Sequence, residues 1–383
     1  MSDVLRLNDT GLYCEAGDFY VDPWRPVERA IVTHAHADHA RRGSRWYLTT
    51  TPGRHVLQAR MGADAKIETW DYGEQRTIGR AKVSLHPAGH ILGSAQVRVE
   101  VDGEVWVAAG DYKTARTDNT CAPFEPVRCH TFITESTFGL PIYRWPEQHE
   151  IDAEINTWWA ANAAKGRASA VFAYALGKSQ RVLAGLDVSI GDIYCHGAVQ
   201  TCNAGYRAVG VPLPETQYAG RKDGEKHKRG DWAGSMIVAP PSALGSTWLR
   251  KFGEVATAFA SGWMQMRGTR RRKGVERGFV LSDHADWPGL NAAIDATGCE
   301  RVLITHGSSN VLMRWQREQG REAHALQTFY GEDEDAADEY ASDTPPDDAP
   351  TDDAPTDETP TNETPPADEP AHDARPNGSP TGG

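Results

Sequence analysis

The sequence predicts an α/β protein whose first part consists mainly of strands and whose middle part alternates strands and helices. Short β-branched and apolar runs bounded by turn residues recur up to about residue 139. Helical and buried-strand patterns alternate after that point. With 383 residues, the chain is long enough for two domains or for one large one.

Strands of the first part are expected in four runs: "RAIVTH", "KVSLHPAGH", "AQVRVEVDGEVWVAAGDY" and "HTFITES". The third run contains "VDGE" between two alternating segments, which predicts a hairpin with its turn at Asp102 and Gly103. One helix is expected near residues 52–61. Most of the first part is therefore β structure.

The middle part begins with the helical periodicity of "EQHEIDAEINTWWAANAAKGR". It continues with a buried strand in "ASAVFAYAL", a helix in "GKSQRVLAGLD", and two more strands in "GSMIVAPPSALGS" and "VATAFASGWM". This alternation is typical of a parallel α/β segment. After it, "GFVLSDHADW" and "RVLITHGSS" are each predicted to be an apolar strand ending in a histidine.

The net charge of −13 is concentrated in the C-terminal tail. Residues 331–383 contain seventeen acidic residues and one basic residue, whereas residues 1–330 carry a net charge of +3. A slightly basic body can approach nucleic acid. The tail is rich in proline and poor in large apolar residues, so we expect it to be disordered. It could bind a partner or mimic DNA, or it could simply add solubility.

Neither a secretory signal nor a membrane span is expected. The N-terminus lacks an apolar segment, and no stretch approaches the length of about 18 apolar residues that a span requires. The six cysteines contain no CxxC pair. We expect a reduced, cytoplasmic protein with no membrane partner.

Residues 33–40 read "THAHADHA" and contain four metal-binding side chains, His34, His36, Asp38 and His39. The histidines are too closely spaced to share one face of a helix. A loop at the end of the strand "AIVT" can instead direct the first two side chains to one metal and the last two to another. Imidazole and carboxylate ligands suit Zn²⁺, with Mn²⁺ or Fe²⁺ as alternatives.

Two metals need further ligands, and three candidates occupy the same setting. His90 follows the strand "KVSLHPAG", Asp111 ends the strand "VWVAAG", and His306 ends "RVLIT". A carboxylate such as Asp111 can bridge two cations, which a neutral imidazole cannot easily do. Together with the first motif, these residues complete a candidate dinuclear site.

With these residues the sequence resembles the metallo-β-lactamase fold, a sandwich of two sheets with helices outside and metals at one edge. The matching motifs are "HAHADH", "AGHILGS", "GDYK" and "THGSS". The resemblance implies that His34, His36 and His90 hold one metal, that Asp38, His39 and His306 hold the second, and that Asp111 bridges them. Asp22, in "FYVDPW", resembles the aspartate that supports the ligand loop, with a plain turn aspartate as the alternative.

Three other stretches, "TESTFG", "LSDHADW" and "ITHGSS", resemble motifs A, B and C of the β-CASP nucleases, a branch of this fold. The resemblance covers about residues 10–330 and implies a metallo-β-lactamase αββα sandwich with an inserted β-CASP α/β domain. We expect the first part of the metallo-β-lactamase domain at 1–139, the insert at 140–277, the second part at 278–330 and the disordered tail at 331–383. The substrate groove is expected between the two domains.

The resemblance implies a metal-dependent nuclease. Two cations can bind the scissile phosphate, activate a water molecule and stabilise the transition state. His284 is the candidate general acid, kept protonated and oriented by Glu135, and we place Asp38 in the same catalytic set. Alternatively, Glu135 could cap a helix that starts at "STFG", and His284 could play only a supporting role.

Basic segments of the expected insert are candidates for nucleic-acid contact. "RKDGEKHKR" (221–229) and "RGTRRRKGVER" (267–277) could follow a phosphate backbone, and "GKSQ" could open a helix whose amides accept a phosphate. The candidate residues are Lys178, Ser179, Arg221, Lys222, Arg270, Arg271 and Arg272. A solvated loop is the alternative reading of each basic run.

Among β-CASP nucleases, the sequence is most similar to the bacterial ligase-associated DNA exonucleases. That resemblance implies DNA as substrate and a repair role beside an ATP-dependent DNA ligase and a helicase. The alternative is an RNA endonuclease or exonuclease of the pre-mRNA cleavage-factor or ribonuclease J type, which His306 favours, because histidine in motif C is typical of the RNA enzymes. A non-catalytic scaffold and a small-molecule hydrolase are more distant alternatives.

Overall fold

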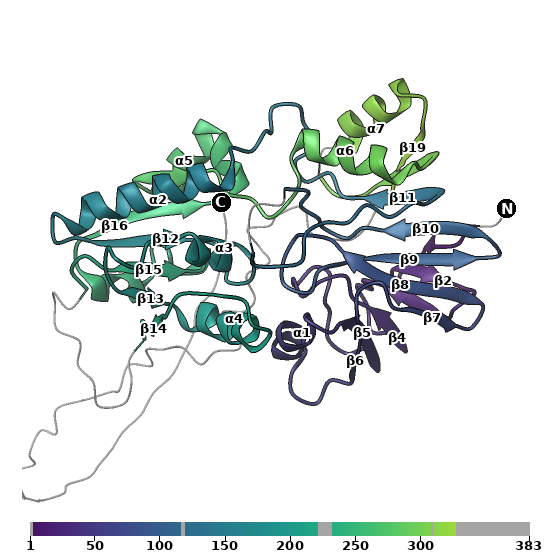
Figure 1. Ribbon diagram of the computed structural model, residues 1–383, viewed down its shortest axis with the longest axis horizontal. Coiled ribbons are helices and arrows are strands. Elements are labelled where there is room, and N and C mark those ends of the chain that lie inside the picture. The colour runs from purple at the N-terminus through teal and green to yellow at the C-terminus, as the bar shows by residue number, and fades with distance from the viewer. Residues whose placement is uncertain (1–2, 116–118, 221–231, 308, 327–383) are drawn as a thin grey trace, which may run out of the picture. The chain divides into compact units, whose positions relative to one another are not determined.

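The computed structural model describes residues 3–115, 119–220, 232–307 and 309–326 (Figure 1). These residues lie in one compact unit that spans Met1–Asp347. The predicted disorder of 331–383 and the basic run 221–229 lie outside the described residues. Among the residues that are described, no helix is both long and apolar enough to cross a membrane.

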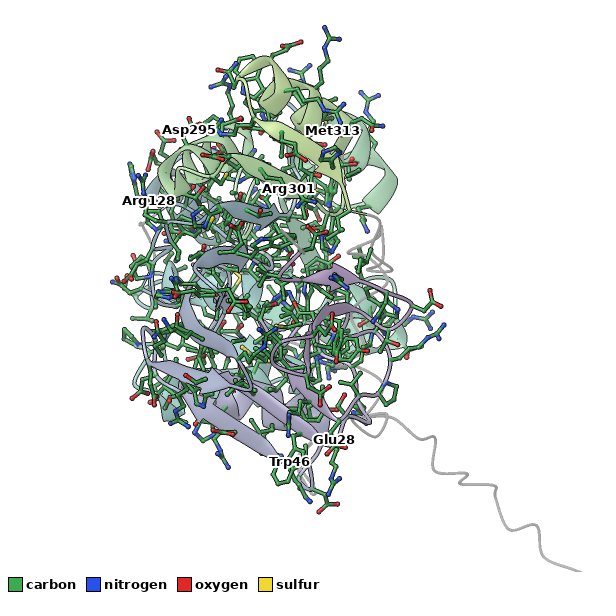
Figure 2. All side chains as sticks on the ribbon, turned by 90° about the vertical axis from the view of Figure 1, so that its right-hand side faces the viewer. Glu28, Trp46, Arg128, Asp295, Arg301 and Met313 are labelled. Carbon is green, nitrogen blue, oxygen red and sulfur yellow. The ribbon has the colours of Figure 1, made fainter. Side chains whose placement is uncertain are left out.

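The first sheet has the strand order β1-β2-β3-β4-β5-β6. Its strands are β1 (Arg6–Leu7), β2 (Leu12–Cys14), β3 (Phe19–Val21), β4 (Arg29–Ile31), β5 (Trp46–Thr50) and β6 (Ile67–Trp70). Because neighbouring parallel strands need a crossover connection, α1 (Arg54–Met61) joins β5 to β6, as the sequence predicts. Figure 2 shows Glu28 and Trp46 side by side at the start of β4 and β5, where the Trp46 N–H donates to the Glu28 carbonyl (3.1 Å).

The second sheet has the order β19-β18-β11-β10-β9-β8-β7. Its strands are β7 (Gln75–Ile78), β8 (Ala81–Pro87), β9 (Ala95–Val101), β10 (Glu104–Ala108), β11 (Thr131–Thr134), β18 (Arg301–Ile304) and β19 (Glu322–Ala325). The predicted hairpin is confirmed: Val101 pairs with Glu104, and Asp102 and Gly103 have φ of 51° and 88°. Two positive φ values are typical of a type I′ turn.

Side chains of the second sheet alternate between two hydrophobic cores. Trp106 and Ala108 of β10 pack in a core that also contains residues of the first sheet, whereas Val107 packs with α6 (Trp287–Thr297) and α7 (Ser309–Glu318). Figure 1 shows these two helices beside β11 and β19. Since successive side chains point to opposite faces, a sheet covered on both faces needs continuous apolar runs such as "VWVAA".

The third sheet is entirely parallel and has the order β14-β13-β15-β12-β16-β17. Its strands are β12 (Ala168–Phe172), β13 (Ile193–Cys195), β14 (Gln217–Tyr218), β15 (Met236–Ala239), β16 (Val255–Ala260) and β17 (Arg277–Phe279). The helices around it are α2 (Gln148–Ala163), α3 (Lys178–Ala184), α4 (Gly197–Ala208) and α5 (Arg267–Lys273), with short 3-10 turns η1 (Pro241–Ala243), η2 (Thr247–Phe252) and η3 (Gly262–Gln265) (Figure 1).

The predicted parallel α/β segment, and with it the mixed α/β class, is confirmed. The third sheet extends past the predicted end of the insert at 277, because β17 ends at Phe279. Domain boundaries at 139/140 and 277/278 stay a prediction. The solvated-loop reading of the run 267–277 is wrong for its first half, which forms α5.

The packing of α2 on the third sheet can be tested by a substitution at Trp159. It is fully buried, and its indole N–H donates to the carbonyl of Gly234 (2.8 Å). Trp159→Ala leaves a cavity and an unpaired carbonyl, so we expect a loss of about 3–5 kcal/mol in the free energy of unfolding, measured by urea titration. Trp158→Ala, at the half-buried neighbouring position, is the control and should cost clearly less. Equal losses would contradict this packing.

Candidate metal centre

The candidate ligands lie where strands end. Asp111, Glu135 and His306 follow β10, β11 and β18, which are neighbouring parallel strands. The carboxyl ends of neighbouring parallel strands lie at the same edge of a sheet, so these side chains meet although they are far apart in sequence. His90 follows β8 of the same sheet, and His34 follows β4 of the first sheet.

Among the described residues, five groups of side chains could hold a metal ion, because within each group the ligand atoms lie within 4.8 Å of one another. Two of them, His90 with Asp283 and His284 and Asp111 with Glu135 and His284, border the site, and the other three contain only expected ligands. They are His34, His36, His90 and Asp111; His34, Asp38 and His39; and His39, Asp111 and His306. All seven metal ligands expected from the sequence therefore lie together in the structure.

Asp111 connects the groups. Its Oδ2 lies 3.4 Å from Nε2 of His34 and 3.4 Å from Nε2 of His39, and Nε2 of His90 is 3.8 Å away. Asp111 is 5% exposed. One buried carboxylate oxygen thus faces three imidazoles that come from two strand ends.

The other nitrogen of each ring contacts the protein. Nδ1 of His34 lies 3.0 Å from the Thr33 hydroxyl, and Nδ1 of His39 lies 2.8 Å from Oδ2 of Asp22. Asp22 also accepts the backbone N–H (2.7 Å) and the hydroxyl (2.6 Å) of Thr33. Asp22 therefore supports the ligand loop, as the resemblance implied. Such contacts fix the ring orientation and tautomer of metal-binding histidines.

His36 and His90 are oriented by backbone carbonyls. Nε2 of His36 lies 3.1 Å from the carbonyl of Leu176, and Nδ1 of His90 lies 2.9 Å from the carbonyl of Asp283. Their remaining nitrogens, Nδ1 of His36 and Nε2 of His90, face each other at 3.0 Å. Two imidazoles thus present converging nitrogens to one point.

The electrostatics of the cluster suit a cation. Burial lowers the pKa of His34 and of His90 well below the usual value, and neighbouring histidines lower it further. Burial also lowers the pKa of His306, to about 4. The neutral imidazole is the form that binds metals. For His39, burial lowers the pKa, but Asp38 and Asp111 raise it well above the usual value. The carboxylates of Asp38 and Asp111 thus place negative charge beside His39, and this charge favours a bound cation. The imidazole and carboxylate donors fit a divalent ion.

A buried Glu135–His284 pair borders the cluster. Nδ1 of His284 lies 2.8 Å from Oε2 and 3.0 Å from Oε1 of Glu135, which also accepts the N–H of Tyr112 (2.9 Å). Burial raises the pKa of Glu135, and the adjacent His284 opposes this shift. The alternative in which Glu135 caps a helix is wrong, because residues 135–147 contain no helix.

The loop 282–284 is held by three side chains, and the sequence assigned no role to two of them, Lys113 and Trp145. The backbone carbonyls of residues 282, 283 and 284 accept hydrogen bonds from Lys113 (2.8 Å), His90 (2.9 Å) and Trp145 (2.9 Å), in that order. The side chain of Asp283 is fully buried. The only sequence signals were the charged residues in "GDYK" and "SDHADW".

The structure changes the interpretation of the nucleic-acid candidates. Lys178 and Ser179 are 1% and 0% exposed, and the Lys178 ammonium lies 2.7 Å from Oδ1 of Asp283. Their burial argues against the predicted phosphate contact, because such a contact would break this internal ion pair. Arg271 is exposed on α5. The described residues do not include Arg221 and Lys222, and they include only the backbone of Arg270 and Arg272.

Comparison with known proteins finds no matching family model. A probable DNA ligase of Opitutus terrae is 30% identical over 322 residues, which cover 82% of this chain and 30% of that protein. An RNase J-like protein of Methanocaldococcus jannaschii is 25% identical over 200 residues, or 46% of this chain and 47% of that protein. The cleavage and polyadenylation specificity factor 73 of Drosophila melanogaster is 28% identical over 123 residues, or 32% and 18%. The chain spans less than half the length of each of these relatives.

Divalent metal should stabilise the protein through Asp111. We expect added Mn²⁺ or Zn²⁺ to raise the thermal unfolding temperature, because a ligand at 100 times its Kd contributes about 2.7 kcal/mol. Asp111→Asn removes the carboxylate that two groups share and should abolish most of the rise. Asp64→Asn, an equal charge change on an exposed loop, is the control. An undiminished rise in Asp111→Asn would show that metal binds elsewhere.

Proposed function

Because the chain belongs to the metallo-β-lactamase-fold β-CASP nucleases, we propose that it is a metal-dependent phosphodiesterase that hydrolyses the backbone of a nucleic acid. The observation that carries this proposal is the arrangement around Asp111. This carboxylate belongs to two metal-capable groups and to a third group with Glu135 and His284. A place for two cations thus lies directly beside a candidate proton donor.

We assign the ligands to two positions. The first metal position consists of His34, His36 and His90, and the second metal position consists of Asp38, His39 and His306, with Asp111 shared by both. Zn²⁺ and Mn²⁺ are the ions proposed for these oxygen and nitrogen donors. When bound, two such ions supply Lewis acidity toward the scissile phosphate and activate a water molecule.

His284 is the proposed general acid for the leaving oxygen. Because Glu135 accepts a hydrogen bond at Nδ1 of His284, it orients the ring and favours the imidazolium form. The other ring nitrogen, Nε2, is then the atom that gives its proton to the substrate. Asp38, with a side chain 23% exposed, is proposed to orient the attacking water.

DNA is the proposed substrate, and an ATP-dependent DNA ligase is the proposed partner. The relative named probable DNA ligase contains a region similar to 82% of this chain, and that region is only 30% of its length. Such a relative favours an exonuclease that prepares DNA ends for ligation. The resemblance to ligase-associated nucleases adds a helicase as a further proposed partner.

RNA is the alternative substrate. The relatives named RNase J-like protein and cleavage and polyadenylation specificity factor 73 favour it, as does His306 in the third motif. In this case the same metal positions and the same proton donor would act on an RNA phosphodiester.

Substrate choice can be tested directly. The purified full-length chain is incubated with Mn²⁺ or Zn²⁺ and end-labelled single-stranded DNA, duplex DNA or RNA, with Asp111→Asn as the inactive control. We expect DNA to be shortened progressively from its ends. Cleavage of RNA alone would refute the repair assignment, and equal cleavage by the Asp111→Asn variant would refute the metal-dependent reaction.

The general-acid role of His284 predicts a dependence on the leaving group. His284→Ala should lower kcat on DNA about 100-fold or more. On a p-nitrophenyl ester of a nucleotide, whose leaving group departs without protonation, the loss should be about tenfold or less. Bound metal, measured by atomic emission, should be unchanged. Equal losses on both substrates would assign His284 a purely structural role.

A further inference from the structure

The two metal positions are supported by different parts of the chain. At the second position, His39 contacts Asp22 and His306 contacts the Thr305 hydroxyl (2.8 Å), and all four residues lie outside the expected insert, 140–277. At the first position, His36 contacts the carbonyl of Leu176 (3.1 Å), which lies inside it. Of these contacts, the one at the first position comes from the expected insert.

Helix α3 extends this support to His90. Nη2 of Arg181 donates to the carbonyls of Gly89 (2.9 Å) and His90 (2.6 Å). One turn earlier, Lys178 pairs with Asp283 (2.7 Å), whose carbonyl accepts the His90 contact. The two cationic side chains therefore hold both partners of the hydrogen bond that orients the His90 ring. Both are almost fully buried, at 1% and 2% exposed, where charged contacts are strong.

A glycine permits the close approach of this helix. Gly177 precedes α3 with φ of 94°, a conformation that side chains disfavour. A Cβ at this position would lie 2.4 Å from Cγ2 of Ile91 and 3.1 Å from Oδ2 of Asp283. A larger residue at this position would therefore force Ile91, the segment that carries His90 or α3 itself to shift.

We infer that helix α3 is a positioning element for the first metal position, with Lys178 and Arg181 as positioning residues, so that this position binds metal tightly only when the insert is docked. The inference rests on the metal assignment of the proposed function. Binding free energies are reciprocal, so metal at the first position in turn stabilises the docking of α3. The insert is thereby coupled to one of the two metals and not to the other.

A purely electrostatic role of Lys178 makes the opposite prediction. The Asp283 carboxylate lies near His90 and His284, within one group of possible ligand atoms. If Lys178 acted only through its charge, removing that charge would strengthen the attraction between this carboxylate and a cation. If Lys178 positions the loop, the same change weakens metal binding. The direction of the change in metal affinity therefore distinguishes the electrostatic role from the positioning role.

The test measures metal affinity without substrate. The background is the full-length His306→Ala variant, which retains every ligand of the first position. Lys178→Met is added to it, and the Zn²⁺ affinities of the two proteins are compared by competition with a chromogenic chelator. We expect binding to weaken about tenfold or more, as for other residues that orient metal ligands. Unchanged or tighter binding would overturn the inference.

Further variants guard against a folding defect. Lys178→Met with Asp283→Asn removes both charges of this ion pair without a change in net charge, and it should show the same weakening. Asn162→Ala removes a buried hydrogen bond to Ser169 within the insert (3.0 Å), away from the site, and should leave the affinity unchanged. Equal weakening by Asn162→Ala would reduce the effect to general loosening and would refute positioning by α3.

Selectivity is tested in full-length His90→Ala, which leaves the second position intact. Lys178→Met in this background should not change the Zn²⁺ affinity, and an equal loss would overturn the selective coupling. If His306→Ala without further changes bound no metal, the ligand assignment of the proposed function would fail. That result is distinct from metal binding that does not respond to Lys178.

Discussion

The parallel pairing of β10, β11 and β18 is the constraint on which the candidate site depends. Ala108 pairs with Ile133, and Thr134 pairs with Ile304, so the three strands end at the same level and deliver Asp111, Glu135 and His306 to one place. A one-residue slip would turn each strand's side chains to the opposite face. Both faces are packed against separate cores, which makes such a slip costly.

A cluster of this composition is unfavourable without compensation, because burying polar and charged groups costs free energy unless they are paired. The chain compensates from several sides: Asp22 and Thr33 orient the first motif, Glu135 pairs with His284, and Asp111 lies among three imidazoles. His306 has φ of 50°, a conformation uncommon outside glycine. Compensation and strain at one place are typical of a functional site.

The middle part of the chain contributes more than a covering layer. Its parallel sheet presents the loop after β12 to the metal centre, where the Leu176 carbonyl reaches His36. In sequence, Lys178 was a candidate for phosphate contact. In the structure, it pairs with Asp283 and joins the third sheet to the loop that carries His284. Both observations connect the middle part of the chain to the candidate metal site and to the loop of His284, the proposed general acid.

The sequence alone determined most of the elements and the candidate donor set, whereas the strand expected in "GFVLSDHADW" ends at Phe279, before the histidine. The hairpin at Asp102 and Gly103, helix α1 and the alternation of strand and helix follow from local patterns, and the spacing of "HAHADH" together with histidines and an aspartate after apolar strands indicated the ligands. Only the tertiary structure decided which ring nitrogen faces Asp111, that Asp22 supports His39, and that Lys178 is buried. These features depend on contacts between residues far apart in the chain, about which local periodicity carries no information.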